Sequence, residues 1–175
     1  MEIKKEILFP KEVISRRVGE LAGQISRDYD GRELLLVGIL KGGFIFMADL
    51  IREISVPCRV DFVRLASYGD SSQSSGKVNI TKDLETPITG RDVLIVEDII
   101  DSGFTLAYLV KVLREREPSS LRVCAFLDKK EKRQTPFEAD YVGFTIPDVF
   151  VIGYGLDFKE NFRFLPDIYL LHDIA

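Results

Sequence analysis

Three short apolar runs place the strongest constraint on how this chain can fold. They occupy residues 34–40, 93–96 and 121–127, and turn residues bound them. A strand that is apolar at successive positions is buried on both faces, which is typical of the interior of a parallel sheet. Because helix patterns alternate with strand patterns, we predict an α/β fold with a central, mostly parallel sheet flanked by helices.

Three helices are predicted from the spacing of apolar residues and from the residues that start or stop a helix at the ends of each segment. The first covers residues 10–29, with Pro10 in its first turn and Asp30 after it. The second covers residues 44–53, and the third runs from Phe104 to about Arg116, where Pro118 closes it. The apolar start of the second helix, residues 44–47, fits either a subunit interface or the core.

Further strands are predicted outside the three apolar runs. Cys58, Val60 and Phe62 alternate on one face of one strand, a short strand lies around residues 78–80, and the tail from Tyr141 is strand-like. No repeat or linker divides the 175 residues. At this length one core is the default, so we expect a single domain over residues 1–175.

Charge and hydropathy exclude several classes of protein. The formal net charge is −4, which gives no overall attraction to nucleic acid or to anionic lipid. No apolar run reaches the ~18 residues that cross a bilayer, and the start of the chain lacks the apolar stretch of a secretory signal. We therefore expect a cytoplasmic protein that binds neither nucleic acid nor membrane.

The cysteines and the histidine offer little chemistry. Cys58 and Cys124 stand alone in apolar segments, which favours small, buried and reduced side chains. His172 is the single histidine, so every multi-histidine metal motif is absent, and it is a weak candidate for acid–base work.

The most informative stretch runs from residue 93 to residue 105. A buried strand ends in Glu97 and Asp98, a short turn carries Asp101, and small residues open a helix. A helix start exposes unpaired N–H groups at the positive end of its dipole, so residues 101–105 can bind a phosphate monoester. The three carboxylates would repel a phosphate, and they are better suited to binding ribose hydroxyls or Mg²⁺ or to transferring a proton. In the alternative, Asp101 and Ser102 only cap the helix, and the other two acids are solvated.

The sequence Glu97-Asp98-Ile99-Ile100-Asp101-Ser102-Gly103 resembles the diphosphoribosyl-binding signature of the type I phosphoribosyltransferases, in its hypoxanthine-guanine form. Other blocks follow in the order of that family over nearly the whole chain. Leu40-Lys41-Gly42-Gly43 resembles its pyrophosphate loop, and Ser67-Tyr68-Gly69 the start of its catalytic lid. Lys129 and residues 150–157, continuing to Arg163, resemble its purine pocket.

The resemblance implies a fold and a reaction. It implies a sheet with a small hood formed by the N- and C-terminal segments, and a peptide bond before Lys41 in the cis form. It implies a Mg²⁺-dependent transfer that joins hypoxanthine or guanine to 5-phosphoribosyl 1-diphosphate, yielding IMP or GMP and pyrophosphate. Members of the family are usually homodimers or homotetramers.

The resemblance also assigns roles to residues. Asp101 is the acid–base group at the purine N7, while Glu97 and Asp98 hold the ribose hydroxyls directly or through Mg²⁺. Lys129 donates to the 6-oxo group, and Asp157 ligates a second Mg²⁺. The remaining assignments are the 5′-phosphate loop (Asp101, Ser102, Gly103, Phe104, Thr105), the pyrophosphate contacts (Lys41, Gly42, Gly43, Ser67, Tyr68, Arg163) and the purine slot (Lys129, Phe150, Val151, Asp157).

Several alternatives stay open at this stage. Lys130 competes with Lys129, Phe150 is equally an ordinary core aromatic, and Arg163 is equally a surface cation. Phe104 stands where relatives often carry lysine. The polar loop over residues 67–77 is expected to be a mobile lid. Rival functions are a nucleotide-sensing regulator of the same fold and an enzyme that prefers xanthine.

Overall fold

The large sheet of this protein contains six strands. The structure, a computed structural model, describes residues 4–67 and 78–172. The strand order is β4 (Val78–Lys82), β3 (Cys58–Ser67), β2 (Leu34–Leu40), β5 (Asp92–Ile100), β6 (Ser120–Asp128) and β7 (Tyr141–Thr145). Every neighbouring pair is parallel except β3 with β4. The predicted mostly parallel α/β sheet is confirmed.

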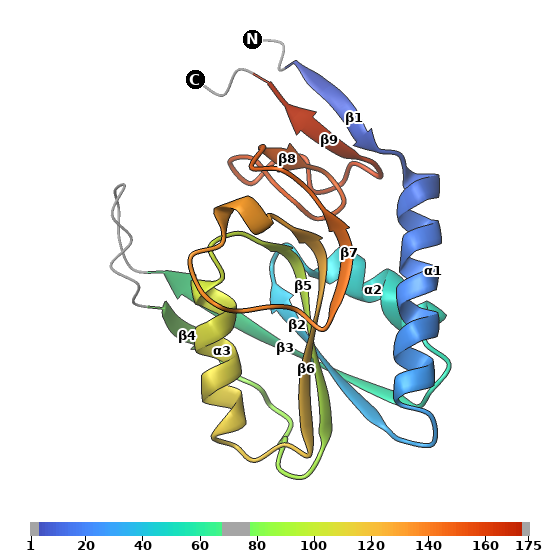
Figure 1. Cartoon of the computed structure of the whole chain (residues 1–175), viewed down its shortest axis with the longest axis vertical. Helices are drawn as coiled ribbons and strands as arrows, with labels where there is room; N and C mark the ends of the chain where they lie inside the picture. The colour runs from blue at the N-terminus through green and yellow to red at the C-terminus, as the bar shows by residue number, and fades with distance from the viewer. Residues whose placement is uncertain (1–3, 68–77, 173–175) are drawn as a thin grey trace.

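Helices cover both faces of this sheet (Figure 1). Helices α1 (Lys11–Asp28) and α2 (Phe44–Glu53) lie on one face, and α3 (Phe104–Arg114) lies on the other. Strand β5 shows why its sequence is apolar throughout. Leu94 and Val96 pack in the cluster that contains α1 and α2, whereas Val93 and Ile95 pack in the cluster that contains α3.

A second, antiparallel sheet lies beyond one end of the large sheet (Figure 1). It joins β1 (Lys5–Phe9), β9 (Ile168–Leu171) and β8 (Val151–Ile152) in the order β1-β9-β8. The family resemblance implied such a hood from the two terminal segments, and the structure confirms it. We call these three strands, with the turns between β8 and β9, the hood. Its residues Val151, Tyr154 and Ile168 belong to the same core cluster as α1 and α2.

Element boundaries differ from the predictions in a few places. Strand β5 does not end at Glu97 and Asp98 but continues to Ile100, because its parallel pairing with β6 extends to the pair Ile100 and Asp128. Helix α3 ends at Arg114 rather than near residue 116. Pro10 precedes α1 as its N-cap, with an extended backbone, instead of lying in the first turn. A short 3-10 helix, η1 (Lys130–Lys132), follows β6.

The exposure of individual side chains bears on three of the predictions. Phe46 and Met47 are core residues, at 0% and 1% exposure, and Phe44 is the exposed aromatic of α2. Both cysteines are free thiols, as predicted; Cys124 is buried, whereas Cys58, also expected to be buried, is only partly so. Val60, which the sequence analysis placed on one face of its strand with Cys58 and Phe62, is 40% exposed.

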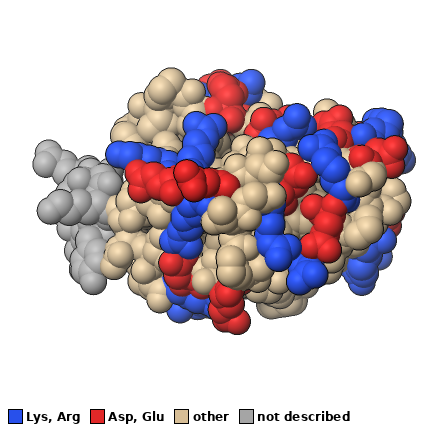
Figure 2. Space-filling view, turned by 90° about the horizontal axis from the view of Figure 1, so that it is seen from below, with Lys and Arg blue, Asp and Glu red and all other residues tan. Residues whose placement is uncertain are grey.

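The surface of the described residues mixes charges of both signs. Figure 2 views the end of the molecule that faces away from the hood, and there Lys and Arg are interspersed with Asp and Glu. This face carries no continuous basic field of the kind that binds nucleic acid. Among the residues that the structure describes, no helix is both long enough and apolar enough to cross a membrane.

Asp61 in β3 is a buried acid that stabilises a loop. Its carboxylate accepts hydrogen bonds from the backbone N–H groups of Phe62, Glu85 and Thr86, at 2.7, 2.9 and 2.7 Å. Burial alone would raise the pKa of Asp61, but the hydrogen bonds from Thr86, Phe62 and Glu85 outweigh it and hold the pKa below its usual range.

We predict that Asp61→Asn lowers the free energy of unfolding by about 1–3 kcal/mol at pH 7, because buried N–H groups lose an acceptor. A lowered folded-state pKa stabilises the protein above the unfolded pKa of about 3.9. That stabilisation is lost as the pH falls through the lowered pKa, so the difference between the two proteins should shrink as the solution is acidified. Urea unfolding at pH 7 and pH 3 measures this, with the exposed Asp30→Asn as control. A constant difference at both pH values would contradict the prediction.

Candidate functional site

Three turns meet at the carboxyl ends of adjacent parallel strands. Residues 41–43 follow β2, residues 101–103 follow β5, and residues 129–132 follow β6. Ligands of open α/β sheets bind at this edge. The parallel order β2-β5-β6 therefore brings together segments that are far apart in the sequence, and several of the predicted site residues lie on them.

The entry loop of α3, residues 101–105, has the geometry of an anion site. Gly103 is the N-cap of α3, and no side chain caps the helix. The first helical hydrogen bond is donated by the N–H of Ala107 to the carbonyl of Gly103. The interpretation that Asp101 and Ser102 only cap the helix is thus wrong. A cavity of about 190 Å³ opens here, lined by Glu97, Ile99, Ile100, Asp101, Ser102, Gly103, Thr105 and Leu106.

Gly103 is required for the shape of this loop. Its φ is +86°, which residues with a side chain rarely adopt, and a Cβ would lie 2.4 Å from Thr135 Oγ1. Phe104 is 38% exposed. The wall opposite Gly103 comes from residues 133–135, where Gln134 N–H donates to the Ser102 carbonyl at 2.9 Å and Arg133 Nε donates to the Asp101 carbonyl at 3.2 Å.

Glu97 and Asp98 form a crowded acid pair at the end of β5. Glu97 is 8% exposed and lines the cavity. Burial raises the pKa of Glu97 well above its usual value, and repulsion from Asp98 raises it further. Burial also raises the pKa of Asp98. Two adjacent carboxylates with raised pKa values, one buried and one partly buried, favour a bound proton, a hydroxyl donor or a cation beside them.

The turn after β2 lies directly against Asp98. The peptide bond between Leu40 and Lys41 is cis, as the resemblance implied. A Cβ on Gly42 would lie 1.6 Å from Asp98 Oδ2, so only glycine fits there. Gly155 of the hood has a φ of +95° and also lies against this turn, because a Cβ added to Gly155 would be 2.2 Å from the Gly42 carbonyl oxygen. Gly42 is therefore enclosed by β5 and by the hood.

A charged cluster of Asp101, Lys129, Lys132 and Asp148 lies beside the entry loop. Lys129 is 5% exposed, and its Nζ is 3.1 Å from Asp101 Oδ1 and 3.5 Å from Asp148 Oδ1. Lys132 Nζ is 3.5 Å from Asp101 Oδ2 and 3.6 Å from Asp148 Oδ1. Each acid thus contacts both ammonium groups, so the charges of the cluster balance.

The contacts of Lys129 and Lys130 distinguish these two candidates. Lys130 Nζ lies 3.8 Å from Glu138 at the surface, whereas Lys129 faces Asp101. The sequence analysis missed Lys132 and Asp148. Lys132 was hidden in a run of charges that is typical of a solvated loop, and Asp148 follows Pro147 in a segment with no other signal.

An exposed aromatic ring marks the hood side of the site. Phe150 is 38% exposed and contacts Phe158 edge-to-face, with ring centroids 5.6 Å apart. It is not an ordinary core aromatic. The next residue, Val151, is buried and begins β8, where it pairs with Leu170.

Arg163 belongs to a network and is not an isolated surface cation. Its Nη1 donates to the Gly155 carbonyl at 2.8 Å, and its Nη2 lies 2.8 Å from Asp157 Oδ1 and 3.2 Å from Glu160 Oε1. Lys41 Nζ also contacts Glu160, at 2.6 Å from its Oε2. The cations Lys41 and Arg163 therefore meet at one carboxylate.

Part of the predicted site cannot be placed. Tyr68 and most of the expected lid over residues 67–77 lie outside the described residues, and Ser67 is the last residue of β3. His172, the weak acid–base candidate, lies at the far end of the hood, with Nε2 3.4 Å from Glu6 Oε2.

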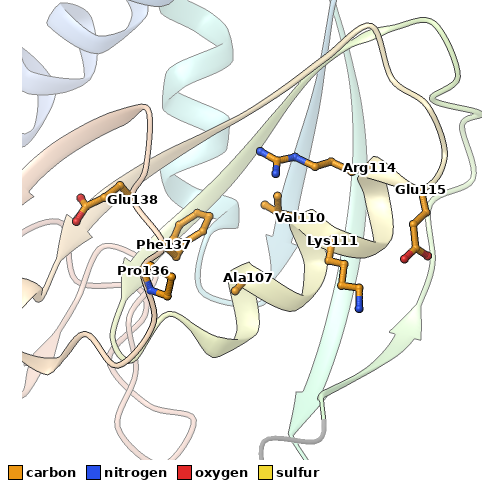
Figure 3. Close-up of a pocket in the computed structure, with 8 residues that line it drawn as sticks. All are labelled: Ala107, Val110, Lys111, Arg114, Glu115, Pro136, Phe137 and Glu138. Atoms are coloured by element: carbon orange, nitrogen blue, oxygen red, sulfur yellow. The ribbon is translucent and has the colours of Figure 1, made fainter.

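A larger groove lies away from this edge (Figure 3). It has a volume of about 660 Å³ and is lined by Ala107, Val110, Lys111, Arg114, Glu115, Pro136, Phe137 and Glu138. Figure 3 shows Val110 and Phe137 on its two walls, with Arg114 extending from α3. None of the predicted site residues lines it. The size of this groove is not by itself evidence of a chemical function. The candidate site is therefore the one at the carboxyl edge of the sheet.

Comparisons with known proteins match this geometry. The family model described as "Phosphoribosyl transferase domain" matches residues 6–159. The hypoxanthine-guanine phosphoribosyltransferase of Bacillus subtilis is 47% identical over 167 residues, which are 95% of this chain and 93% of the relative. The hypoxanthine phosphoribosyltransferase of Salmonella typhimurium is 48% identical and covers 92% of both chains. The chain belongs to the hypoxanthine-guanine phosphoribosyltransferase family.

A solved structure supports the same assignment. The hypoxanthine-guanine phosphoribosyltransferase of Bacillus anthracis superposes with a TM-score of 0.92 at 46% identity, covering 97% of this chain and 99% of that one. This phosphoribosyltransferase is therefore an enzyme of purine salvage, and the nucleotide-sensing regulator is set aside.

Arg133 connects the entry loop of this phosphoribosyltransferase to its core. Besides the Asp101 carbonyl, it binds Asp128, which is 0% exposed. Burial raises the pKa of Asp128 in spite of the guanidinium beside it. Removing the arginine would leave a buried carboxylate without a partner.

We predict that Arg133→Met destabilises the protein by about 3–5 kcal/mol, the usual result of breaking a buried ion pair. Adding Asp128→Leu should restore part of that loss. Urea unfolding measures both variants. The control is Arg91→Met, whose guanidinium lies 3.2 Å from Glu33 at the surface and which should cost at most about 1 kcal/mol. Similar losses for Arg133→Met and the control would refute the prediction.

Proposed function

We propose that this enzyme joins hypoxanthine or guanine to 5-phosphoribosyl 1-diphosphate and releases pyrophosphate with IMP or GMP. One observation carries the proposal: an uncapped helix start, an acid–ammonium pair and an exposed aromatic ring all lie at one edge of the sheet. These are the groups needed for a phosphate, a purine with a carbonyl oxygen, and the face of its ring. The names of the relatives point to the same bases.

Each part of the substrate has a proposed partner. The 5′-phosphate binds the N–H groups of the entry loop (Asp101, Ser102, Gly103, Phe104, Thr105), which needs no lysine at position 104. The ribose hydroxyls face Glu97 and Asp98. The diphosphate binds Lys41, Gly42, Gly43 and Arg163, together with Ser67 and Tyr68 at the lid.

The purine lies over Phe150, with its edge against the Val151 backbone. Lys129 donates to the 6-oxo group from a position that is almost fully buried. Adenine carries an amino donor there, and two buried donors facing each other are costly. Asp101, whose Oδ1 lies 3.1 Å from Lys129 Nζ, takes the role of holding the N7 proton.

The acids of the site fit Mg²⁺ as a partner. Glu97 and Asp98 repel each other, and a divalent cation would relieve this repulsion. Among the described residues no group of three acids, cysteines or histidines forms a metal cluster. Mg²⁺ often uses one or two carboxylates with waters and substrate phosphates, so we propose Glu97 and Asp98 for one ion and Asp157 for a second. When bound, Mg²⁺ supplies positive charge to the departing diphosphate.

The setting of the enzyme is also proposed. We place it in the cytoplasm, which the two free thiols support. We propose that residues 1–175 act as one domain, since hood and sheet share a core cluster, and that the chain forms a homodimer or homotetramer. Neither nucleic acid nor a membrane is a proposed partner, in keeping with the net charge of −4.

Incubation with Mg²⁺, 5-phosphoribosyl 1-diphosphate and one purine at a time tests the proposal. We expect nucleotide with hypoxanthine and guanine, none with adenine, and none when Mg²⁺ is chelated. A parallel reaction with xanthine tests the remaining alternative, an enzyme that prefers xanthine. Absence of product with both hypoxanthine and guanine would overturn the proposal.

We predict that Asp101→Asn lowers kcat by about 10²–10⁴-fold, the usual contribution of a general acid–base group. Binding of ribose 5-phosphate should stay nearly unchanged, because the backbone N–H groups remain. Steady-state kinetics and calorimetric titration measure the two effects. Asp30→Asn, at an exposed position away from the site, is the control and should retain full activity. Unchanged turnover of the Asp101 variant would exclude the assigned role.

A further inference from the structure

Glu160 lies between the two cations that the proposed function assigns to the diphosphate. Its Oε2 is 2.6 Å from Lys41 Nζ, and its Oε1 is 3.2 Å from Arg163 Nη2. Lys41 lies on the turn after β2, and Arg163 lies in the hood, so this carboxylate bridges two parts of the molecule. The side chain of Glu160 is 64% exposed.

The turn that carries Glu160 is held independently of the carboxylate. The backbone groups of Phe158 and Asn161 exchange hydrogen bonds at 3.1 and 3.0 Å. The N–H of Glu160 donates to Asp157 Oδ2 at 2.9 Å. Arg163 is likewise held by the Gly155 carbonyl and by Asp157. Removing the charge of Glu160 should therefore leave the turn and Arg163 in place.

We propose that Glu160 is an internal competitor for the diphosphate site. The inference rests on the proposed function, because it takes Lys41 and Arg163 as diphosphate ligands. The carboxylate presents one oxygen to each cation, as two oxygens of a diphosphate would. Binding of the diphosphate displaces Glu160, and Glu160 returns to the cations when pyrophosphate leaves.

The strength of the contact suits this exchange. Ion pairs between exposed side chains are weak and screened by salt, so a polyanion of higher charge displaces a single carboxylate. The competition lowers the affinity for pyrophosphate and speeds its release. Product release limits turnover in many enzymes, so an acid at this position favours turnover over tight binding.

Calorimetric titration with pyrophosphate in the presence of Mg²⁺ tests the inference. We expect Glu160→Gln to bind pyrophosphate about two- to fivefold more tightly than the wild type, the range for losing an exposed ion pair. The gain should shrink at high salt. It should also shrink in a Lys41→Met background, which removes one of the two bridged cations.

Two controls separate local competition from a general change of charge. Glu138→Gln removes the same charge from an exposed glutamate that pairs with Lys130, away from the site, and should leave pyrophosphate affinity unchanged. Ribose 5-phosphate, which we assign to the entry loop, should bind the wild type and Glu160→Gln equally.

Equal affinity of wild type and Glu160→Gln for pyrophosphate would overturn the inference and leave the proposed function standing. Weaker binding by the variant would also overturn it, since Glu160 would then orient Arg163 for the ligand. If neither protein binds pyrophosphate, the proposed function fails, and the inference fails with it.

Discussion

The parallel register of β2, β5 and β6 is the constraint on which the rest of the structure depends. Parallel strands end at the same edge, so the turn after each strand is delivered to one place. The entry loop of α3, the turn at Gly42 and the segment that starts with Lys129 become neighbours only through this register. The hood then closes the edge, with Gly155 packed against the Gly42 carbonyl.

Charge at this edge is arranged in groups that pair acids with cations. Asp101 and Asp148 face Lys129 and Lys132, while Glu160 lies between Lys41 and Arg163. Balanced groups avoid leaving buried or crowded charges without partners, which would destabilise the fold. In the proposed function, the carboxylate oxygens of Glu160 lie where oxygens of the diphosphate would bind Lys41 and Arg163. In the proposed function, the substrate displaces some of these ion pairs when it binds.

Much of the fold and of the candidate site could be predicted, and the misses have physical reasons. The apolar runs marked the buried strands because both faces of a parallel sheet exclude water. The length of β5 was missed because Glu97 and Asp98 look like the end of a strand, and only pairing with β6 shows that it continues. Lys132 and Asp148 were missed because their contacts join segments that no local pattern relates.

The sequence by itself determined the class of fold, the helix start that we propose as the anion site, and the family. Apolar periodicity, glycine positions and clustered acids are local properties, and each has a local physical consequence. Only the tertiary structure decided that Lys129 rather than Lys130 faces Asp101, and that Glu160 joins Lys41 to Arg163. Such contacts depend on the direction of side chains across separate turns, which is set by packing between elements.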